Sequence, residues 1–316
     1  MPLRIGTRTS ALARWQTSHV QALLHGVEPT LAGNAVEIVP FSTVGDDLAD
    51  APLEVMEGTG FFSSTLERAL LEGRIDVAVH SYKDLPVAAT PGLVIACVPA
   101  RGAVEDVLCA RDGLTLAGLH AGALVGTSSP RRTAQLRALR PDLHFTSLRG
   151  NVPTRLARVE RGLMDAIVLA RAGLERLGLA AHATQIFPVE QVLPAPAQGA
   201  LAVQARAADT ALLQRLSALD HAPTRLAVQA EREVLHQLRG GCSVPVGAFA
   251  RVEHGEIWLT AGVFALDGSR AHRVAVSGES PIDVGAEAAR RLLDLGAGTI
   301  LESLERTARV AVERRP

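Results

Sequence analysis

Short apolar runs alternate with stretches of helical periodicity in the first part of the chain. Residues 3–7, 36–41 and 75–79 are apolar and rich in β-branched side chains, which predicts three strands. Thr9 or Ser10 is placed to cap a helix after the first strand, and a later helix at about 62–72 is expected to end at Gly73. The buried face of the first helix is expected to hold Leu12, Trp15, Val20, Leu23 and Leu24.

Two parts of this pattern recur later in the chain. Residues 72–79 resemble 161–168, since both read as a helix end, a glycine and a buried strand. Residues 5–10 resemble 125–130, because in both a strand runs into hydroxyl residues that suit a helix cap. This weak internal duplication predicts two related α/β lobes. Two such lobes that face each other enclose a cleft, which is a common place for a ligand.

The pattern changes after about residue 193. Residues 193–199 form a proline-rich connection, followed by an expected buried strand at 200–204 and a helix at 209–218. A boundary near Asp220 precedes a long helix, to Leu238, that Thr224 is placed to cap. Strands at 246–252, 256–264 and 273–277, joined by turns at 254–255 and 267–268, and two final helices predict a small α+β domain.

Composition narrows the class of protein. The chain has 316 residues and a net charge of −1, without the basic excess typical of nucleic-acid-binding proteins. No run approaches the length of a membrane-spanning helix, and the first residues lack the apolar core of a signal peptide. We therefore expect a cytoplasmic protein that binds neither nucleic acid nor membrane. The cysteines Cys97, Cys109 and Cys242 are odd in number and lack metal-site spacing, so neither a disulfide framework nor a metal site is expected.

One segment is purely acidic. Residues 45–60 contain three glycines, one proline and five acidic residues, and no basic residue. This composition predicts a mobile loop that serves as a lid.

Two charged residues follow the strand at 75–79. Lys83 and Asp84 lie at the carboxyl end of that strand, the edge at which open α/β sheets bind ligands. Lys83 is the only lysine among 32 basic residues, which indicates a need for a compact ammonium rather than a planar guanidinium. The alternative is that Asp84 caps a turn and that Lys83 is a solvated charge.

Hydroxyl groups and arginines gather in the second lobe. Residues 126–132 combine a hydroxyl-rich turn, Pro130 at the first helical position and two arginines, which predicts an anion site. Residues 147–155 repeat this pattern, and Arg171 and Arg176 follow the next strand. Phosphate-loop and dinucleotide fingerprints do not occur, so carboxylates are favoured over nucleotides as ligands. The alternative for any single arginine is a solvated surface charge.

Cys242 follows two glycines, which let the backbone turn freely and leave the thiol accessible. The carboxyl end of a helix does not lower the pKa of a thiol, so Cys242 is no obvious activated nucleophile. The alternative is a cysteine packed as a small apolar side chain, which is also the interpretation of Cys97 and Cys109.

Taken together, these motifs resemble those of the porphobilinogen deaminase (hydroxymethylbilane synthase) family, in order and over nearly the whole chain. They are RIGTRTS at 4–10, HSYKDLP at 80–86, GTSSPRR at 126–132, SLRGNVPTR at 147–155, LARAGLERLG at 169–178, LPAPAQG at 193–199 and LRGGCSVP at 238–245.

The resemblance implies an α/β fold with two lobes similar to type II periplasmic binding proteins and a small C-terminal α+β domain with a three-stranded sheet. The implied domains are residues 1–99 with 200–217, residues 100–199, and residues 220–316. The implied reaction joins four porphobilinogen molecules head to tail, with loss of ammonia, to give hydroxymethylbilane in tetrapyrrole biosynthesis. The product would pass to uroporphyrinogen-III synthase, and a monomer is expected.

The resemblance also implies a covalent dipyrromethane cofactor, made from substrate and attached to Cys242 as a thioether, and it places Asp84 as the catalytic carboxylate. A carboxylate beside the pyrrole nitrogens suits a reaction whose electrophile is a cation. The implied cofactor-binding residues are Ser81, Lys83, Thr127, Ser128, Ser129, Arg131, Arg132 and Gly150. The implied substrate-binding residues are Arg8, Ser10, Arg149, Arg155, Arg176 and Gln198.

One segment departs from the family pattern. Many members have two lysines in the loop aligned with residues 55–60, and both basic positions are absent here. Two other functions compete from the residues alone: a two-lobed binding protein for a small dianion, and a transferase without a covalent cofactor. The binding protein has no use for the glycine-flanked Cys242 or the third domain, and it usually needs a signal peptide. Intact mass separates all three functions, because only the deaminase predicts a native chain heavier by two linked pyrroles.

Overall fold

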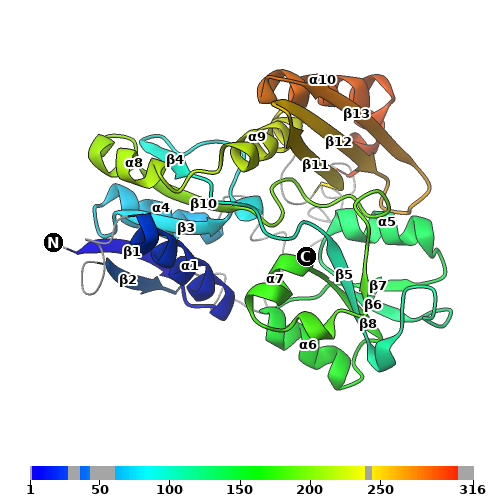
Figure 1. Ribbon diagram of the computed structural model, residues 1–316. Coiled ribbons are helices and arrows are strands. Elements are labelled where there is room, and N and C mark those ends of the chain that lie inside the picture. The colour runs from blue at the N-terminus through cyan, green and yellow to red at the C-terminus, as the bar shows by residue number, and fades with distance from the viewer. Residues whose placement is uncertain (1, 28–35, 43–60, 239–243, 305–316) are drawn as a thin grey trace, which may run out of the picture.

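The computed structural model describes residues 2–27, 36–42, 61–238 and 244–304, with side chains at 61–64 left aside. The acidic segment 45–60 and Cys242 lie outside the described residues, so their predicted roles are not tested by the fold. Figure 1 shows two α/β lobes and a third unit packed against both.

The first lobe is built on a five-stranded mixed sheet of order β2-β1-β3-β10-β4. Strand β1 is parallel to β2 and β3, whereas β10 is antiparallel to both β3 and β4. The strands are β1 (Leu3–Arg8), β2 (Val36–Phe41), β3 (Val77–Ser81), β4 (Leu93–Cys97) and β10 (Leu201–Arg206), and the helices are α1 (Ala11–Val27), α4 (Phe61–Leu71) and α8 (Thr210–Ser217).

The second lobe repeats this plan. Its sheet has the order β7-β6-β8-β5-β9, with β6 parallel to β7 and β8, and β5 antiparallel to its two neighbours. The strands are β5 (Asp106–Ala110), β6 (Leu124–Gly126), β7 (His144–Thr146), β8 (Ala166–Ala170) and β9 (Gln185–Ile186), and the helices are α5 (Pro130–Leu139), α6 (Val152–Glu160) and α7 (Arg171–Arg176). The duplication predicted from the sequence is therefore confirmed.

Two crossings of the chain connect the lobes. The chain leaves the first lobe after β4 and enters the second with β5; it later returns to the first with β10. The fourth strand of each sheet thus follows a crossing, which explains why it is antiparallel to the third. The crossings touch at Gly102, whose N–H donates to the carbonyl of Gly199 at 3.1 Å.

The third unit is an antiparallel sheet of order β11-β12-β13 covered by two helices. Its elements are β11 (Val246–Glu253), β12 (Glu256–Phe264), β13 (Ala271–Gly278), α9 (Ala222–Gln237) and α10 (Pro281–Asp294), followed by helical residues 297–304. The hairpin turns lie where expected, with positive φ at His254, Gly255 and Gly268.

Two sequence predictions about helices are wrong. Thr224 lies inside α9 rather than at its cap; the cap is His221, whose Nδ1 accepts a hydrogen bond from the N–H of Thr224 at 3.3 Å. Trp15 does not lie in the buried stripe of α1, since 37% of it is exposed and its ring faces the second lobe through Arg176. In the described part of the chain, no helix combines the length and apolar character needed to cross a membrane.

Candidate active site

The Asp84 turn, defined here as residues 82–86, follows the buried strand β3. Tyr82–Asp84 form a short 3-10 helix (η3), with the N–H of Tyr82 bonded to the carbonyl of Ala200 at 3.0 Å. Tyr82 and Leu85 are buried, whereas Asp84 is exposed. The apolar side chains therefore anchor the turn and leave the carboxylate of Asp84 directed outward.

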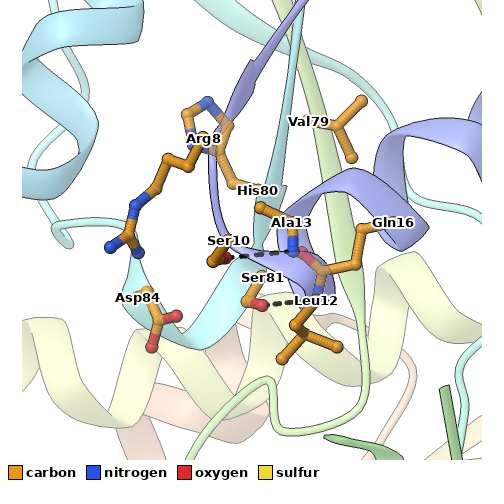
Figure 2. Close-up of a pocket in the computed structure, with 9 residues that line it drawn as sticks. All are labelled: Arg8, Ser10, Leu12, Ala13, Gln16, Val79, His80, Ser81 and Asp84. Carbon is orange, nitrogen blue, oxygen red and sulfur yellow. Dashed lines mark hydrogen bonds between the residues drawn. The ribbon is translucent and has the colours of Figure 1, made fainter. Parts of the chain in front are cut away.

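Asp84 lines a pocket formed by the ends of β1 and β3 and the start of α1 (Figure 2). Ser10 caps α1, with its Oγ accepting from the N–H of Ala13 at 3.3 Å. Gln16 donates from Nε2 to Oγ of Ser81 at 2.7 Å. The pocket is lined by Arg8, Ser10, Leu12, Ala13, Gln16, Val79, His80, Ser81 and Asp84. The structure thus brings together Arg8, Ser10, Ser81 and Asp84, which the sequence had placed in one site.

His80 also lines the pocket but is held in its neutral form. Burial lowers its pKa to about 4, an effect that Glu67 and the hydrogen bond with Gln204 partly oppose. Its Nε2 lies 3.1 Å from Oε1 of Gln204, and Nε2 of Gln204 donates to Glu67 at 3.0 Å. His80 therefore adds no positive charge to the pocket at neutral pH.

Lys83 points toward the crossing rather than into this pocket. Its Nζ donates to Oε1 of Gln198 at 3.3 Å. Burial lowers the pKa of Lys83 to about 8; Asp84 and Asp106 oppose this effect, while Arg132 and Arg131 add to it. Gln198 is fully buried and donates from Nε2 to the carboxylate of Asp106 at 2.9 Å, so it connects the lysine to the second lobe.

Asp106 is the centre of a buried ionic cluster. Its Oδ2 accepts from Nη1 of Arg131 at 2.7 Å, and its Oδ1 accepts from Nη2 of Arg132 at 2.7 Å. The side chain of Asp106 is completely buried, and the two guanidinium groups hold the pKa of its carboxyl far below the usual range. Asp106 therefore keeps Arg131 and Arg132 side by side at the N-terminus of α5.

The cluster carries more positive than negative charge. Among the described residues of this cluster, Lys83, Arg131 and Arg132 supply three cations and Asp106 supplies one carboxylate. Nε of Arg131 is buried and meets no hydrogen-bond acceptor among the described residues. A buried excess of cations is costly unless anions balance it, so this cluster is suited to bind carboxylates.

Comparison with known proteins matches the chain to one family. Residues 3–214 match the family model "Porphobilinogen deaminase, dipyromethane cofactor binding domain", and residues 225–294 match "Porphobilinogen deaminase, C-terminal domain". The chain is 51% identical over 274 residues to a porphobilinogen deaminase of Thermobifida fusca, covering 86% of this chain and 84% of that protein. It is 46% identical over 304 residues to one of Brevibacillus brevis, covering 96% and 97%.

The chain belongs to the porphobilinogen deaminase family. It is thus an enzyme of porphyrin biosynthesis, and residues 3–214 form its dipyrromethane-binding region. Among solved structures, it is similar to the methionine binding protein MetQ, with 12% identity, a TM-score of 0.43, and coverage of 73% of this chain and 91% of that one. At that score the similarity is loose, and the description of the fold rests on the sheets themselves.

The hydroxyl residues of the deaminase motif at 126–132 have structural partners. Oγ of Ser129 caps α5, accepting from the N–H of Arg132 at 3.4 Å. Oγ of Ser128 donates to the carbonyl of Leu148 at 2.7 Å and accepts from its N–H at 2.9 Å. Thr127 is buried and accepts from the N–H of Ser129 at 3.2 Å. These contacts fix the turn that presents the first residues of α5.

Two other arginines of the deaminase motifs, Arg155 and Arg176, interact with groups of the first lobe or of the crossing. Burial lowers the pKa of Arg155 to about 10, with Arg132 adding to this effect and Asp84 opposing it. Arg155 donates from Nε to the carbonyl of Gly150 at 2.7 Å, across a turn in which Gly150 has a φ of 98°. Arg176 donates to the carbonyl of Gly199 at 2.6 Å and lies over the ring of Trp15. Arg149 is half-buried.

Sequence reasoning missed Asp106, Gln16 and Arg232. Asp106 begins a buried strand, where a carboxylate is the exception, and this position was a readable signal. Gln16 and Arg232 have no such signal, because polar residues on helices are common and only the packing of α1 and α9 against β3 and residues 82–86 brings them to the site.

Proposed function

We propose that the chain is a transferase that joins four porphobilinogen molecules head to tail, releases ammonia at each step and forms hydroxymethylbilane. The growing chain is held on a dipyrromethane bound to Cys242. The observation that supports this best is the charge of the site: one exposed carboxylate, Asp84, lies near a buried cluster with a surplus of cations.

The residues present fit a bound dipyrromethane. Such a group carries acetate and propionate side chains, and Lys83, Arg131 and Arg132 are within reach of one another through Gln198 and Asp106. Nε of Arg131, which meets no acceptor in the described part of the chain, offers one more donor. When bound, the group supplies a terminal pyrrole to which substrate is added.

Asp84 is proposed as the catalytic carboxylate. Loss of ammonia from an aminomethylpyrrole leaves a cation, which a nearby carboxylate stabilises. The same carboxylate is placed to exchange protons with the departing amine or the pyrrole nitrogens. The exposed position of Asp84 at the pocket is compatible with both roles, because its oxygens are open to a ligand.

The cations are proposed to bind the substrate and the growing chain. Arginine forms planar bidentate pairs with carboxylates, and each added pyrrole brings two more of them. Arg8 lines the pocket with Ser10, and Arg155 lies close enough to Asp84 to interact with its charge. Arg149 and Arg176 are assigned to the same task, together with the hydroxyl residues 127–129, Ser81, Gly150 and Gln198.

The assignment of Cys242 is tested by intact mass. The native chain is expected to be heavier than its sequence by two linked pyrroles, and Cys242→Ser should lack this mass, since a hydroxyl is a far poorer nucleophile than a thiol. Cys97→Ser and Cys109→Ser are matched controls, because burial raises the pKa of both thiols to about 12. A native chain without added mass would favour the binding-protein or cofactor-free alternatives, and pyrroles on Cys97 or Cys109 would contradict the attachment site.

The assignment of Asp84 is tested by Asp84→Asn. This change removes the negative charge opposite a developing cation with little change of shape, so the variant should fold, retain its bound pyrroles and lose most turnover. Product formation and intact mass are measured on the same preparation. A folded, loaded Asp84→Asn enzyme that works like the unaltered one would refute the assignment.

The domain limits 1–99 with 200–217, 100–199 and 220–316 are proposed on the same resemblance. A cytoplasmic location, a monomeric state and transfer of the product to uroporphyrinogen-III synthase stay predictions.

A further inference from the structure

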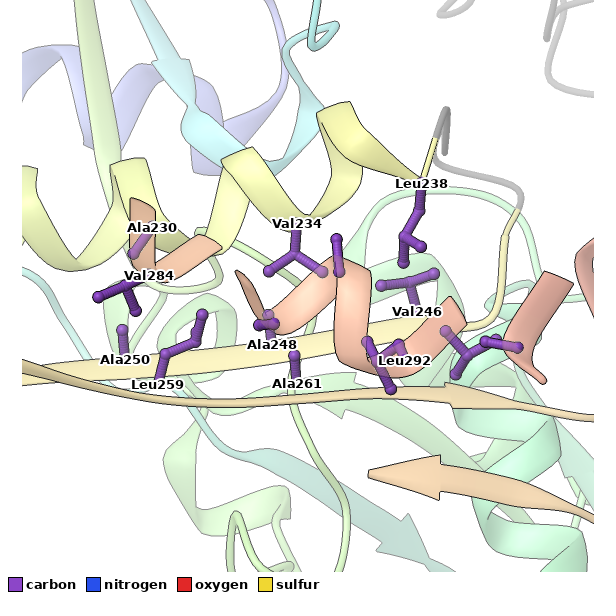
Figure 3. Packing of buried hydrophobic residues seen from close by; sticks show 14 of the residues in the cluster. Ala230, Val234, Leu238, Val246, Ala248, Ala250, Leu259, Ala261, Val284 and Leu292 are labelled. Carbon is purple, nitrogen blue, oxygen red and sulfur yellow. The ribbon is translucent and has the colours of Figure 1, made fainter. Parts of the chain in front are cut away.

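Helix α9 belongs to the third unit, yet one of its faces lies against the first lobe (Figure 1). Its other face packs on its own sheet, where Ala230 and Val234 contact the apolar residues of β11 and β12 (Figure 3). On the first face, Arg225, Val228 and Arg232 follow one another at three- and four-residue spacing, which places them on one side of the helix. Val228 packs with Tyr82 and Leu85 of the Asp84 turn.

Arg232 makes the most specific contact between these two parts. Its Nη1 donates to the carbonyls of Tyr82 at 3.3 Å and Leu85 at 3.1 Å, and its Nη2 donates to the carbonyl of Pro86. Its guanidinium also lies 4.6 Å from the centre of the Tyr82 ring. The carbonyl of Tyr82 also accepts from the N–H of Leu85 at 3.2 Å, whereas those of Leu85 and Pro86 lie beyond the end of the short helix. This one side chain therefore binds carbonyls on both sides of Lys83 and Asp84 in sequence.

We propose that Arg232 is a positioning residue for Asp84: it fixes the Asp84 turn and ties it to α9, the helix that precedes Cys242 in sequence. The inference rests on the proposed role of Asp84. Asp84 is exposed and lies on a turn of three residues, so its direction is set by the backbone beneath it. A guanidinium is suited to this task because its rigid fork reaches several carbonyls at once.

The chain offers a matched control in Arg225, seven residues earlier on the same helix. Arg225 also reaches from α9 to the first lobe, where its Nη2 donates to the carbonyl of Ala96 at 3.0 Å, near the end of β4 rather than at the Asp84 turn. Arg225→Met therefore measures how the loss of one arginine contact between α9 and the first lobe affects stability and activity. Arg232→Met measures the effect of the same kind of loss together with the loss of the contacts to residues 82–86.

The test has two readouts. Tyr82 and Lys83 are the only tyrosine and the only lysine of the chain, so selective isotope labelling gives one backbone amide signal from each. Arg232→Met should move or broaden both signals and lower kcat by about tenfold to a hundredfold, with a much smaller change in KM, because a displaced reacting group affects the chemical step. Arg225→Met should leave kcat and the Lys83 signal unchanged while lowering the unfolding temperature. Arg232→Lys, which keeps the charge but loses the fork, should give an intermediate kcat.

These outcomes separate the inference from the proposed function. If Asp84→Asn is inactive in the same assay while Arg232→Met keeps both kcat and the Lys83 signal, the positioning role is wrong and the assignment of Asp84 stands. If Asp84→Asn is fully active, the proposed function fails whatever Arg232 does. Should Arg232→Met not fold, Arg232→Lys decides the question: an unchanged kcat and unchanged signals overturn the inference.

Discussion

Lys83 is distinguished by its residue type, its burial and its neighbours. It is the only lysine of the chain, it lies next to Asp84, and its ammonium is held by the buried amide of Gln198. Burial lowers its pKa to about 8, whereas a guanidinium stays charged at every pH at which proteins fold. Lys83 is therefore the member of the cluster whose positive charge is lost just above neutral pH.

This leads to a prediction for Lys83→Arg. The ammonium form is present below a pH of about 8 and is lost above it, so carboxylate binding that depends on Lys83 should weaken as the pH rises through 8. The guanidinium of the variant would stay charged and remove this decline. Its bulk and planar fork should nevertheless lower turnover, because a guanidinium beside Asp84 is able to form a bidentate pair with that carboxylate.

The measurement is the pH profile of turnover for both proteins, with bound pyrroles checked by mass. If the loaded variant works within about twofold of the unaltered enzyme, a difference of only about 0.4 kcal/mol, the choice of lysine has no functional meaning. If its decline above pH 8 persists, a group other than Lys83 causes that decline.

Residues at strand ends were predictable from the sequence, and buried partners were not. Asp84 and Lys83 follow a strand whose apolar pattern is plain, so their place at the sheet edge could be inferred. The place of Asp106 at the start of a buried strand is a signal in the sequence, but its partners Arg131 and Arg132 are identified only when α5 and β5 pack together, because they lie 25 and 26 residues away in sequence. The contacts of the Gln198 amide with Lys83, Asp106 and the carbonyl of Val104 likewise depend on packing that the sequence pattern does not record.

Among the elements, most strands and helices and the connection at 193–199 are predicted by the sequence, whereas the contact between the two crossings is not. Apolar periodicity locates β1, β2, β10 and the three strands of the third unit, because each buries one or both faces. The close approach of the two crossings depends on backbone contacts that no periodicity records. At Gly199, φ is 84° and a Cβ atom would lie 2.5 Å from the carbonyl oxygen of Ala103.

Gly199→Ala is therefore expected to disturb the connection between the lobes. Gly73→Ala is the matched control, since Gly73 has a similar φ of 68° but, in the described part of the chain, no atom within 4 Å of the added Cβ. Gly73→Ala should lower the free energy of unfolding by about 1–2 kcal/mol, because an alanine is strained in the left-handed conformation. Gly199→Ala should cost clearly more, because backbone must also move, and thermal unfolding of both variants measures the difference. Equal losses of stability in the two variants would mean that the crossings shift to accommodate the added methyl group at no cost in free energy.

At the scale of the whole molecule, one buried carboxylate joins all three parts. Glu231 on α9 accepts two hydrogen bonds from Arg101 of the first crossing, at 2.7 and 2.9 Å. It also accepts from the N–H of Ala197 in the second crossing and the N–H of Ala250 in β11, at 2.6 and 2.7 Å. Each oxygen of Glu231 thus receives one guanidinium and one backbone donor, so the carboxylate satisfies donors from three separate segments.

Glu231→Gln should break this junction while preserving its shape. The amide nitrogen of glutamine would face an arginine and a backbone N–H, which are donors only, and Arg101 would be left buried without a counter-charge. Removing one partner of a buried pair costs about 3–5 kcal/mol. The variant should therefore unfold at a clearly lower temperature, and its turnover should fall, because the three parts no longer share one fixed contact.

The control for this last prediction is Glu287→Gln on α10. Glu287 pairs with Arg290 and Arg291 at 2.7 and 2.6 Å, but at the surface, where solvent screens the charges and the pairs contribute little. The ion pairs in the two sites have similar distances. We nevertheless expect a large loss of stability for Glu231→Gln and a small one for Glu287→Gln, because only Glu231 is buried. If Glu231→Gln unfolds at the same temperature as Glu287→Gln, the three parts are held together by their apolar contacts, and the buried carboxylate is dispensable.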